Sequence, residues 1–145
     1  MIKFVKASEV LSLRSSVLRD GKPLEECIFP GDDDQNTFHL ADIQNETAVC
    51  VASFFLKEHP ERKGKAYQLR GMATAAEFRN RGVGNQLMNF AIVYLRGLQT
   101  DYVWCNARKA AYSFYLGLGF EFISPEFEIE GIGTHRVMIL VVSIK

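Results

Sequence analysis

The stretch that decides the fold of this chain reads Met72-Ala73-Thr74-Ala75-Ala76-Glu77-Phe78-Arg79-Asn80-Arg81-Gly82-Val83-Gly84. It has the pattern of an apolar strand end, a short turn, and Arg-x-x-Gly-x-Gly at the start of a long amphipathic helix. The first turn of a helix has unpaired backbone N–H groups and the positive end of the helix dipole, so it attracts an anion such as a pyrophosphate. Gly82 and Gly84 let a ligand approach the backbone without a Cβ in the way. The stretch therefore predicts an anion site beside a strand end.

Two common phosphate-binding loops do not fit this stretch. No Gly-Lys-Ser/Thr follows the glycines, so it is not a P-loop, and the spacing differs from the Gly-x-Gly-x-x-Gly of a dinucleotide fold. By itself, Arg-x-x-Gly-x-Gly is equally typical of an ordinary turn before a helix. The rest of the chain has to distinguish an anion site from an ordinary turn.

Length and charge indicate one globular domain. The chain has 145 residues, of which 48% are hydrophobic and 23% charged, and we predict a single domain over residues 1–145. The formal net charge is zero, which argues against a general binder of nucleic acid or of membrane surfaces. An anion site must then be local. Basic residues near the motif in sequence, which belong either to that site or to a solvated face, are Arg70, Arg79, Arg81, Arg108 and Lys109.

The cysteines indicate a reducing environment. Cys27, Cys50 and Cys105 are odd in number and widely spaced, which suits neither a disulfide framework nor a zinc site. No signal peptide or membrane-spanning run is visible, so we predict a cytoplasmic protein without a metal. The acidic run Asp32–Asp34 is expected to be a solvated turn, with metal binding as its alternative.

Hydrophobic periodicity predicts a mixed central β-sheet flanked by helices on both faces. The expected helices are one capped by Ser8 and running to about Arg19, a short one at Leu24–Cys27, one from Val83 that ends at Gly97 or at Gln99-Thr100, and one at Ala107–Leu116. The expected strands are Ile2–Lys6, Thr37–Ala41, Ala48–Leu56, Ala66–Thr74, Tyr102–Cys105, Phe120–Ile123, Phe127–Ile129 and Arg136–Ser143.

Two segments in this order of elements resemble the GNAT superfamily of acyl-CoA-dependent N-acetyltransferases. The string at 72–84 is similar to the family's motif A. The segment Asn106–Phe120 is similar to motif B, with its Asn, Ala, Phe-Tyr and Gly-Phe in register. The first strand and helix also stand where the family has them, so the resemblance covers the whole chain and implies a GNAT-like fold. Ala76 and Thr74 stand where the family commonly has proline and valine. Neither difference removes the backbone N–H groups or the glycines of the motif.

The resemblance implies how acetyl-CoA, the expected co-substrate, is bound. The pantetheine arm would pair with the strand edge at Met72, Ala73 and Thr74, like an added strand, and the N–H of Ala73 or a neighbour would face the thioester oxygen. A β-bulge near this strand is usual in the family. Asn106 would bond the pantetheine, or cap the following helix instead. The pyrophosphate would lie against the backbone N–H groups of Arg79, Asn80, Arg81, Gly82, Val83, Gly84 and Asn85.

The resemblance also implies a general acid, Tyr115, which would protonate the leaving thiolate; a buried core aromatic is the alternative. Tyr112 is a weaker candidate for the acid and is grouped with the cofactor-binding residues. The strand segment Tyr67–Gly71 has no carboxylate to serve as general base. His39 is the candidate, acting directly or through a water because an imidazole pKa near ~6.5 suits proton uptake, although a structural role is the more common one for a lone histidine. The alternatives for the base are His135 and solvent, and Glu77 is expected to be a surface turn residue.

The implied function is transfer of an acetyl group from acetyl-CoA to a primary amine of a small molecule or peptide, by direct attack in a ternary complex. A non-catalytic CoA-binding sensor or scaffold is the alternative, left open by the missing strand carboxylate. A protein that uses only the glycine loop to bind a nucleotide is disfavoured by motif B. Family members set the acceptor through loops that correspond here to Asp20–Asn36 and Ser124–His135, whose acidic residues suggest a cationic acceptor. Monomer and homodimer both remain open.

Overall fold

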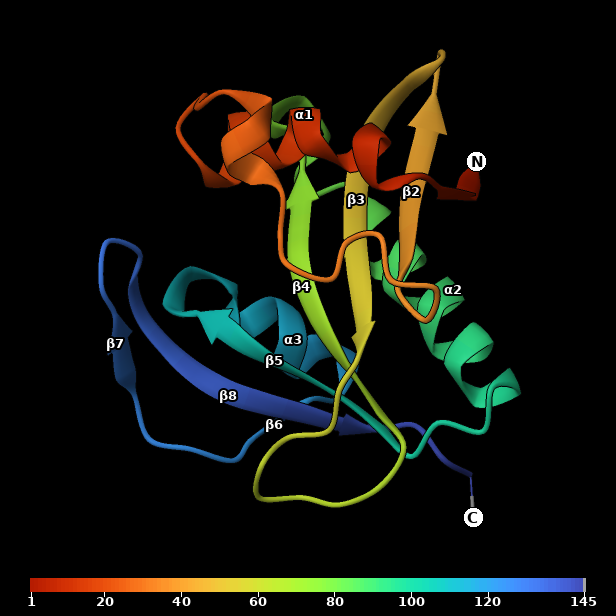
Figure 1. Ribbon diagram of the computed structural model, residues 1–145, viewed down its shortest axis with the longest axis vertical. Helices are drawn as coiled ribbons and strands as arrows, with labels where there is room; N and C mark the ends of the chain where they lie inside the picture. Colours follow the sequence, from red (N-terminus) through yellow and green to blue (C-terminus); the bar gives the residue numbers. More distant parts are fainter. Residues whose placement is uncertain (145) are drawn as a thin grey trace. The chain divides into compact units, whose positions relative to one another are not determined.

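The computed structural model describes residues 1–144, which divide into two compact units (Figure 1). Unit 1 contains Met1–Leu56 and Leu69–Tyr94, and unit 2 contains Lys57–Gln68 and the chain from Leu95 onward. Two elements run from one unit into the other, the strand β4 (Ala66–Thr74) and the helix α2 (Val83–Gly97). The prediction of a single domain stays a prediction.

The strands of residues 1–144 form a mixed sheet. In unit 1 they follow the order β1-β2-β3-β4, and in unit 2 the order β4-β5-β8-β6, with β7 paired to β8. β4 and β5 are parallel, with Ala66 opposite Tyr102, whereas β2 is antiparallel to both β1 and β3. The remaining bounds are β1 Ile2–Val5, β2 Phe38–Gln44, β3 Thr47–Leu56, β5 Tyr102–Arg108, β6 Glu121–Phe122, β7 Phe127–Ile129 and β8 Gly133–Val141.

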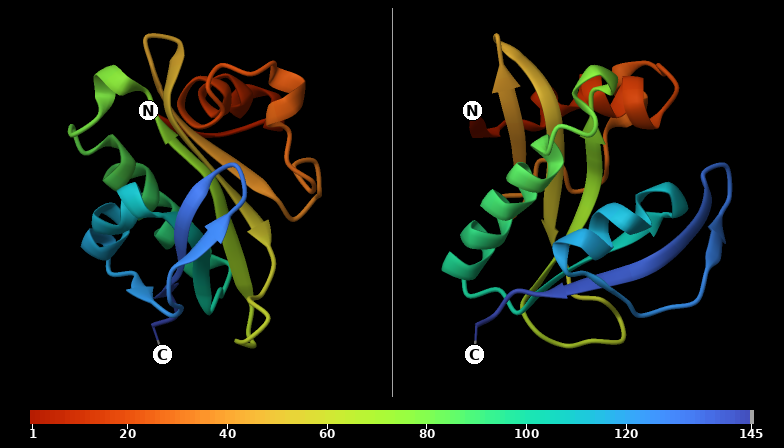
Figure 2. Two further views of the ribbon diagram at one scale, coloured as in Figure 1. Left: turned by 90° about the vertical axis from the view of Figure 1, so that its left-hand side faces the viewer. Right: turned by 180° about the vertical axis from the view of Figure 1, so that it is seen from behind.

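Helices cover both faces of the strands of unit 1 (Figure 2). Because side chains alternate along a strand, Ala41 and Val51 point to one face, where they pack with Val10 and Leu13 of the N-terminal helical segment. On the other face, Phe38 stacks on Phe54 with ring centroids 4.8 Å apart. That face is covered by α2, whose Tyr94 ring lies 4.9 Å from the Phe38 ring. This arrangement confirms the predicted helices on both faces.

The N-terminal helical segment differs from the expected regular helix. It consists of a 3-10 turn at Ala7–Val10, α1 at Leu11–Leu13, and a π-helical turn at Arg14–Leu18. The expected Ser8 cap is wrong, because Lys6 is the N-cap and its N–H donates to the Glu9 carboxylate at 2.7 Å. The short helix at Leu24–Cys27 is confirmed as a 3-10 turn.

Unit 2 packs around Tyr102 and Trp104 of β5. Together with Ala66, Val137 and Ile139 they form a buried apolar cluster. Trp104 Nε1 donates to the carbonyl oxygen of Lys57 at 2.8 Å, and the Tyr102 hydroxyl accepts from the N–H of His59 at 2.9 Å. These two bonds hold the connection between β3 and β4 against β5.

Motif B begins as strand rather than helix, which corrects the expected helix at Ala107–Leu116. β5 continues to Arg108, a 3-10 turn covers Lys109–Ala111, and α3 spans Tyr112–Leu118. Gly119, with φ +100°, ends α3 in the left-handed conformation that glycine tolerates best.

Within the described part of the chain, no helix has the length and apolar character needed to cross a bilayer.

Candidate active site

The turn of motif A lies in unit 1, between β4 and α2. The N–H of Ala75 donates to the carbonyl oxygen of Val49 at 2.8 Å, and a 3-10 turn at Ala76–Phe78 follows. Asn80 and Gly82 then take positive φ values of +62° and +78°. A Cβ on Gly82 would meet nothing within 4 Å, so the glycine serves the backbone conformation and leaves the turn open to a ligand.

Backbone donors of this turn are available for an anion. The N–H of Arg79 donates to the carbonyl oxygen of Ala76 at 3.3 Å, and further along the chain the N–H of Gln86 donates to the carbonyl oxygen of Gly82 at 3.0 Å. A helix start leaves the N–H groups of its first turn without intrahelical acceptors. Of the predicted donors Arg79–Asn85, the Arg79 N–H is thus already bonded within the turn, and an anion site formed by the N–H groups of Asn80–Asn85 stays a prediction.

The strand end before the turn carries the other motif A residues. Ala73 is buried with Val10 and Leu13, Met72 is half-buried, and the Thr74 hydroxyl lies 3.3 Å from the Cys50 thiol. The Arg79 Nε donates to the Thr74 carbonyl at 3.4 Å, so this exposed arginine links the turn back to the strand. Within β4, Gly71 has φ +66°, which interrupts the extended backbone at the strand where the resemblance implies a bulge.

Tyr115, the candidate general acid, lies in unit 2 on α3 and is buried. Its ring centroid lies 5.1 Å from those of both Phe114 and Phe120. Burial raises the pKa of the neighbouring Cys105 thiol strongly, and a side-chain hydrogen bond with Tyr115 lowers that pKa in part. Tyr115 therefore has a polar contact at its hydroxyl as well as apolar packing around its ring.

The two other motif B candidates are surface residues of unit 2. Asn106 is exposed on β5, opposite Val137 of β8. The alternative that it caps the following helix is wrong, because Arg108 precedes the 3-10 turn and Ala111 precedes α3. The Tyr112 hydroxyl donates to Glu126 Oε2 at 3.3 Å. Desolvation and the negative charge of Glu126 raise the pKa of Tyr112.

His39, the candidate base, is buried in unit 1 with both ring nitrogens engaged. Nδ1 lies 2.6 Å from the Ser53 hydroxyl, and Nε2 lies 2.9 Å from the carbonyl oxygen of Asp32. A carbonyl oxygen only accepts, so Nε2 carries the proton and Nδ1 accepts from Ser53. Both nitrogens of this tautomer are occupied, which favours the structural role. His135 is also buried, with Nδ1 2.7 Å from the carbonyl oxygen of Gly133.

Sequence reasoning missed a buried ion pair. Arg14 has no exposed surface; its Nη1 lies 2.6 Å from Asp32 Oδ2 and its Nη2 lies 2.9 Å from Asp32 Oδ1. Asp32 also accepts from the N–H of Phe29 at 2.9 Å, so the expected solvated turn is wrong for this residue. Burial raises the pKa of Asp32, but the Arg14 hydrogen bond and charge and the Phe29 N–H outweigh it and leave the pKa lowered. Spacing offered one signal, because Arg14 falls four residues after Val10 on the apolar stripe.

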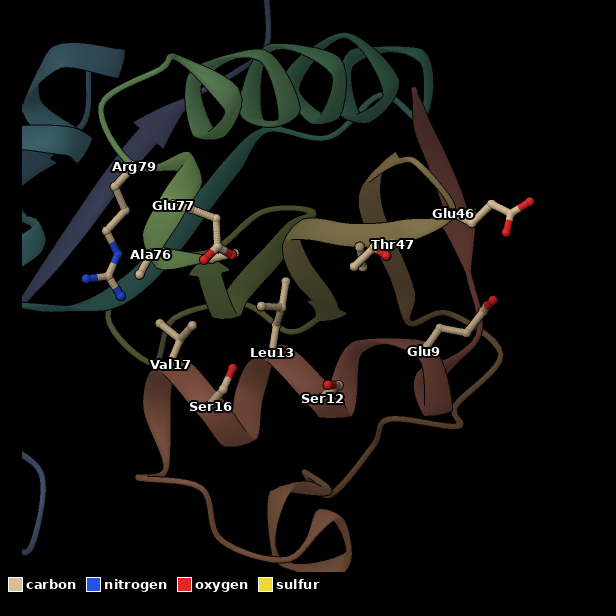
Figure 3. Close-up of a pocket in the computed structure, with 12 residues that line it drawn as sticks. Glu9, Ser12, Leu13, Ser16, Val17, Glu46, Thr47, Ala76, Glu77 and Arg79 are labelled. Atoms are coloured by element: carbon tan, nitrogen blue, oxygen red, sulfur yellow. The ribbon is translucent and has the colours of Figure 1, made fainter.

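A groove of about 560 Å³ lies in unit 1 beside the motif A turn (Figure 3). Leu13 and Val17 of the N-terminal segment form part of its apolar lining, and Glu77 and Arg79 of the turn lie across from them. Glu77 is exposed, as expected for a surface turn residue. The groove shares its wall with the predicted pyrophosphate turn.

Comparison with known proteins identifies the family. Residues 15–140, which include parts of both units, match the family described as the acetyltransferase (GNAT) domain. The chain belongs to the GNAT acetyltransferase family.

Individual relatives agree with this assignment. The chain is 33% identical over 138 residues to the uncharacterized N-acetyltransferase YitI of Bacillus subtilis (strain 168), covering 94% of this chain and 93% of that protein. Its fold is similar to that of an aminoglycoside 6'-N-acetyltransferase in complex with coenzyme A, with a TM-score of 0.76, 10% identity, and coverage of 100% and 98%. The ribosomal-protein-S18-alanine N-acetyltransferase of Escherichia coli also gives a TM-score of 0.76, with 15% identity and coverage of 100% and 95%.

Family membership confirms the predicted fold class and the predicted enzyme class, an acetyl-CoA-dependent N-acetyltransferase, with acetyl-CoA as co-substrate. The donor turn in unit 1 is consistent with this, since Asn80–Asn85 supply the N–H groups that a pyrophosphate requires. The roles of individual residues remain predictions.

Proposed function

We propose that this enzyme transfers the acetyl group of acetyl-CoA to a primary amine of a small molecule or peptide, by direct attack of the amine on the thioester in a ternary complex. The observation that carries the proposal is the motif A turn. Its backbone takes positive φ at Asn80 and Gly82 and leaves the N–H groups of Asn80–Asn85 for an anion.

In this proposal the motif A residues hold the donor. The N–H groups of Asn80–Asn85 bind the pyrophosphate, and the exposed guanidinium groups of Arg79 and Arg81 add positive charge. Met72, Ala73 and Thr74 pair with the pantetheine arm through their backbone, and Ala73 N–H donates to the thioester oxygen as negative charge develops there. Asn106 and Tyr112 contact the cofactor.

Tyr115 protonates the departing thiolate in this proposal. Acyl transfer from a thioester releases a thiolate, and a positioned acid of this kind contributes about 10²–10⁴ in rate. The hydrogen bond between Tyr115 and Cys105 supports a role for the hydroxyl beyond core packing. The base that takes the proton from the acceptor ammonium is solvent, because Tyr67–Gly71 carries no carboxylate and His39 uses both nitrogens structurally.

The same absence of a carboxylate favours one competing function, a CoA-binding sensor or scaffold without catalysis. The enzyme is proposed to act as a monomer or homodimer in a reducing cytoplasm. The three cysteines support the location, since all are free and buried.

The test is a thiol-release assay with acetyl-CoA and a panel of amino acids, polyamines, aminosugars and peptide N-termini, run beside calorimetry of CoA binding. We expect CoA to bind and at least one amine class to release thiol above the hydrolysis background. Arg81→Gln should weaken CoA binding roughly 10-fold, because it removes one charge-assisted contact to the pyrophosphate.

Lys3→Gln is the matched control, since it removes one charge from an exposed position of β1. CoA binding without turnover of any amine would favour the sensor. If ATP or ADP competed with CoA for binding as well as CoA itself does, the turn would instead be a general nucleotide site.

A further inference from the structure

Three guanidinium groups gather around one aromatic ring in unit 1. The guanidinium carbon of Arg14 lies 3.8 Å from the centroid of the Phe29 ring, that of Arg70 lies 4.3 Å away, and that of Arg19 lies 5.6 Å away. The Arg70 group also lies 5.8 Å from the Phe55 ring. We refer to Arg19, Arg70, Phe29 and Phe55 as the arginine cluster.

Only the buried member of this group is neutralised. Arg14 forms its bidentate pair with Asp32, whose Oδ2 also accepts from the Phe29 N–H. Arg19 and Arg70 are half-buried and, in the described part of the chain, have no carboxylate within salt-bridge distance. Two positive charges of the arginine cluster therefore remain unpaired.

The electrostatics of Arg70 reflect this excess of charge. Desolvation by burial lowers its pKa most, and the positive charges of Arg14 and Arg19 lower it further, while Asp32 offsets part of the effect. Like charges held close together and partly out of water destabilise one another. An anion bound between Arg19 and Arg70 would relieve that repulsion.

The position of Arg70 links the cluster to the donor strand. Arg70 and Gly71 both face Phe29, because a Cβ on Gly71 would lie 3.1 Å from the Phe29 ring and the Arg70 guanidinium stacks over the same ring. Regular strand alternation would send them to opposite faces, and the positive φ of Gly71 prevents this. Arg70 is thus turned toward the loop Asp20–Asn36, two residues before Met72.

A second feature adds a donor at the same place. Arg14 Nε is buried and has no hydrogen-bond partner among the described residues, and it lies 3.0 Å from the position of a Gly71 Cβ. Buried donors without an acceptor are uncommon and costly. The surroundings of Gly71 therefore combine two half-buried guanidinium groups that form no ion pair among the described residues with one buried N–H that has no acceptor there.

We propose that the acceptor of this enzyme is an amine that also carries a carboxylate, as an amino acid does, and that Arg70 and Arg19 bind this carboxylate. The inference rests on the proposed function and names its substrate class. It differs from the cationic acceptor suggested by the acidic residues of the two loops. Of the run Asp32–Asp34, Asp32 is already paired with Arg14. The aromatic rings of the arginine cluster hold the guanidinium planes in place through stacking.

The experiment compares matched amines that differ only in the carboxylate. L-Phenylalanine is paired with phenethylamine, and β-alanine with ethylamine, and each is tested for thiol release with acetyl-CoA and for calorimetric binding in the presence of CoA. We expect the carboxylate-bearing member of each pair to bind and react better, by roughly 10- to 100-fold, as for a charge-assisted bond. Arg70→Gln should remove that preference, by lowering binding and turnover of the carboxylate-bearing member of each pair to the level of its carboxylate-free partner.

Arg70→Lys should restore part of the preference, since it keeps the charge without the planar fork. Lys22→Gln is the control, because it removes one charge from an exposed residue of the same loop. Equal binding of both members of every pair, or an Arg70→Gln variant that keeps the preference, would overturn the proposal. Tighter binding of O-phosphoethanolamine than of β-alanine would overturn the choice of a carboxylate.

Measuring acceptor binding separately from thiol release distinguishes a failure of this inference from a failure of the proposed function. Carboxylate-selective binding without thiol release would contradict acetyl transfer but support the arginine site. Thiol release only from the amines that lack a carboxylate would support acetyl transfer and overturn the arginine site.

Discussion

Tyr115 shows how little the identity of a residue says about its role. Its ring packs between Phe114 and Phe120, as a core aromatic would, and its hydroxyl meets the Cys105 thiol. A purely structural tyrosine would affect the free energy of unfolding when changed, whereas an acid would affect the rate of thiolate protonation. Activity and stability therefore have to be measured together.

For the proposed acid, we expect Tyr115→Phe to slow thiol release by about 10²–10⁴ while the affinity for CoA stays unchanged. The reason is that phenylalanine keeps the packing and removes only the proton donor. Steady-state thiol release, calorimetry with CoA and thermal unfolding measure the three effects. Tyr94→Phe, on α2 and outside both motifs, is the matched control, since the Tyr94 ring packs against Phe4 and Phe38. A normal rate in Tyr115→Phe would refute the assignment.

The buried ion pair predicts a pH-dependent stability. The pKa of Asp32 in the folded state lies below its ordinary value of 3.8, so the carboxylate stabilises the fold above that pH. The contribution is lost as the pH falls through the lowered folded pKa. Asp32→Asn should cost about 3–5 kcal/mol near neutral pH, because it leaves the Arg14 charge buried and unpaired.

Urea unfolding measured from pH 7 down to roughly pH 2.5 tests this effect, since the carboxylate becomes protonated within that range. The difference in free energy between the wild type and Asp32→Asn should shrink below pH 4, about where unfolded carboxylates become protonated. Asp33→Asn, at an exposed neighbour, should change little. A difference that is constant with pH would contradict the ion-pair explanation.

His39 gives a third prediction at the residue scale. His39→Ala should lower the free energy of unfolding by about 1–3 kcal/mol, since it leaves buried partners unsatisfied, and should leave the pH profile of thiol release unchanged. Ser53→Ala breaks the bond to Nδ1 without touching the imidazole and should behave in the same way. Loss of an ionisation from the profile in His39→Ala alone would restore His39 as the base.

At the scale of elements, β4 combines a regular strand with one irregular residue. The apolar pattern predicts its bounds, Ala66–Thr74, and the start of α2 at Val83; of the two ends left open for that helix, Gly97 and Gln99-Thr100, the structure has Gly97. The prediction of a helix at Ala107–Leu116 is wrong for its first half. There β5 continues to Arg108 because residues Tyr102–Arg108 pair with β8, a long-range contact that local periodicity does not contain.

The prediction at the scale of elements concerns the stability of a Gly71→Ala variant. Gly71→Ala adds a Cβ 3.0 Å from Arg14 Nε and 3.1 Å from the Phe29 ring, at φ +66°. Gly131→Ala is matched, with φ +78° and nothing within 4 Å of its Cβ. We expect the control to lose about 1–2 kcal/mol from the backbone conformation, and Gly71→Ala to lose roughly 1–3 kcal/mol more through overpacking. Chemical denaturation measures both, and equal losses would contradict the close approach at Gly71.

For the whole molecule, donor binding and stability are linked. A ligand that binds only the folded state stabilises it by about 2.7 kcal/mol at one hundred times its dissociation constant. For a chain of this size that shift raises Tm by roughly 5–10 °C. We therefore expect CoA to raise Tm, and ADP, which lacks the pantetheine arm, to raise it much less at equal concentration. Equal shifts with CoA and ADP in thermal unfolding would contradict a site built for the whole of CoA.

The sequence by itself determined the family, the order of the elements and the donor turn. These depend on residues close together in the chain: the glycines of motif A define the turn, and the helix that follows supplies its N–H groups. Family resemblance then links motif A to motif B without any knowledge of packing.

Only the tertiary structure decided which charges are buried and which are free. The Arg14–Asp32 pair joins residues 18 apart, and the Arg14–Ser53 bond joins residues 39 apart. The outward turn of Arg70 depends on one left-handed glycine beside a buried guanidinium. Local pattern does not encode such arrangements, because the free energy of a charge depends on what the folded chain places around it. The proposed donor site is thus largely a local property, and the proposed acceptor preference a tertiary one.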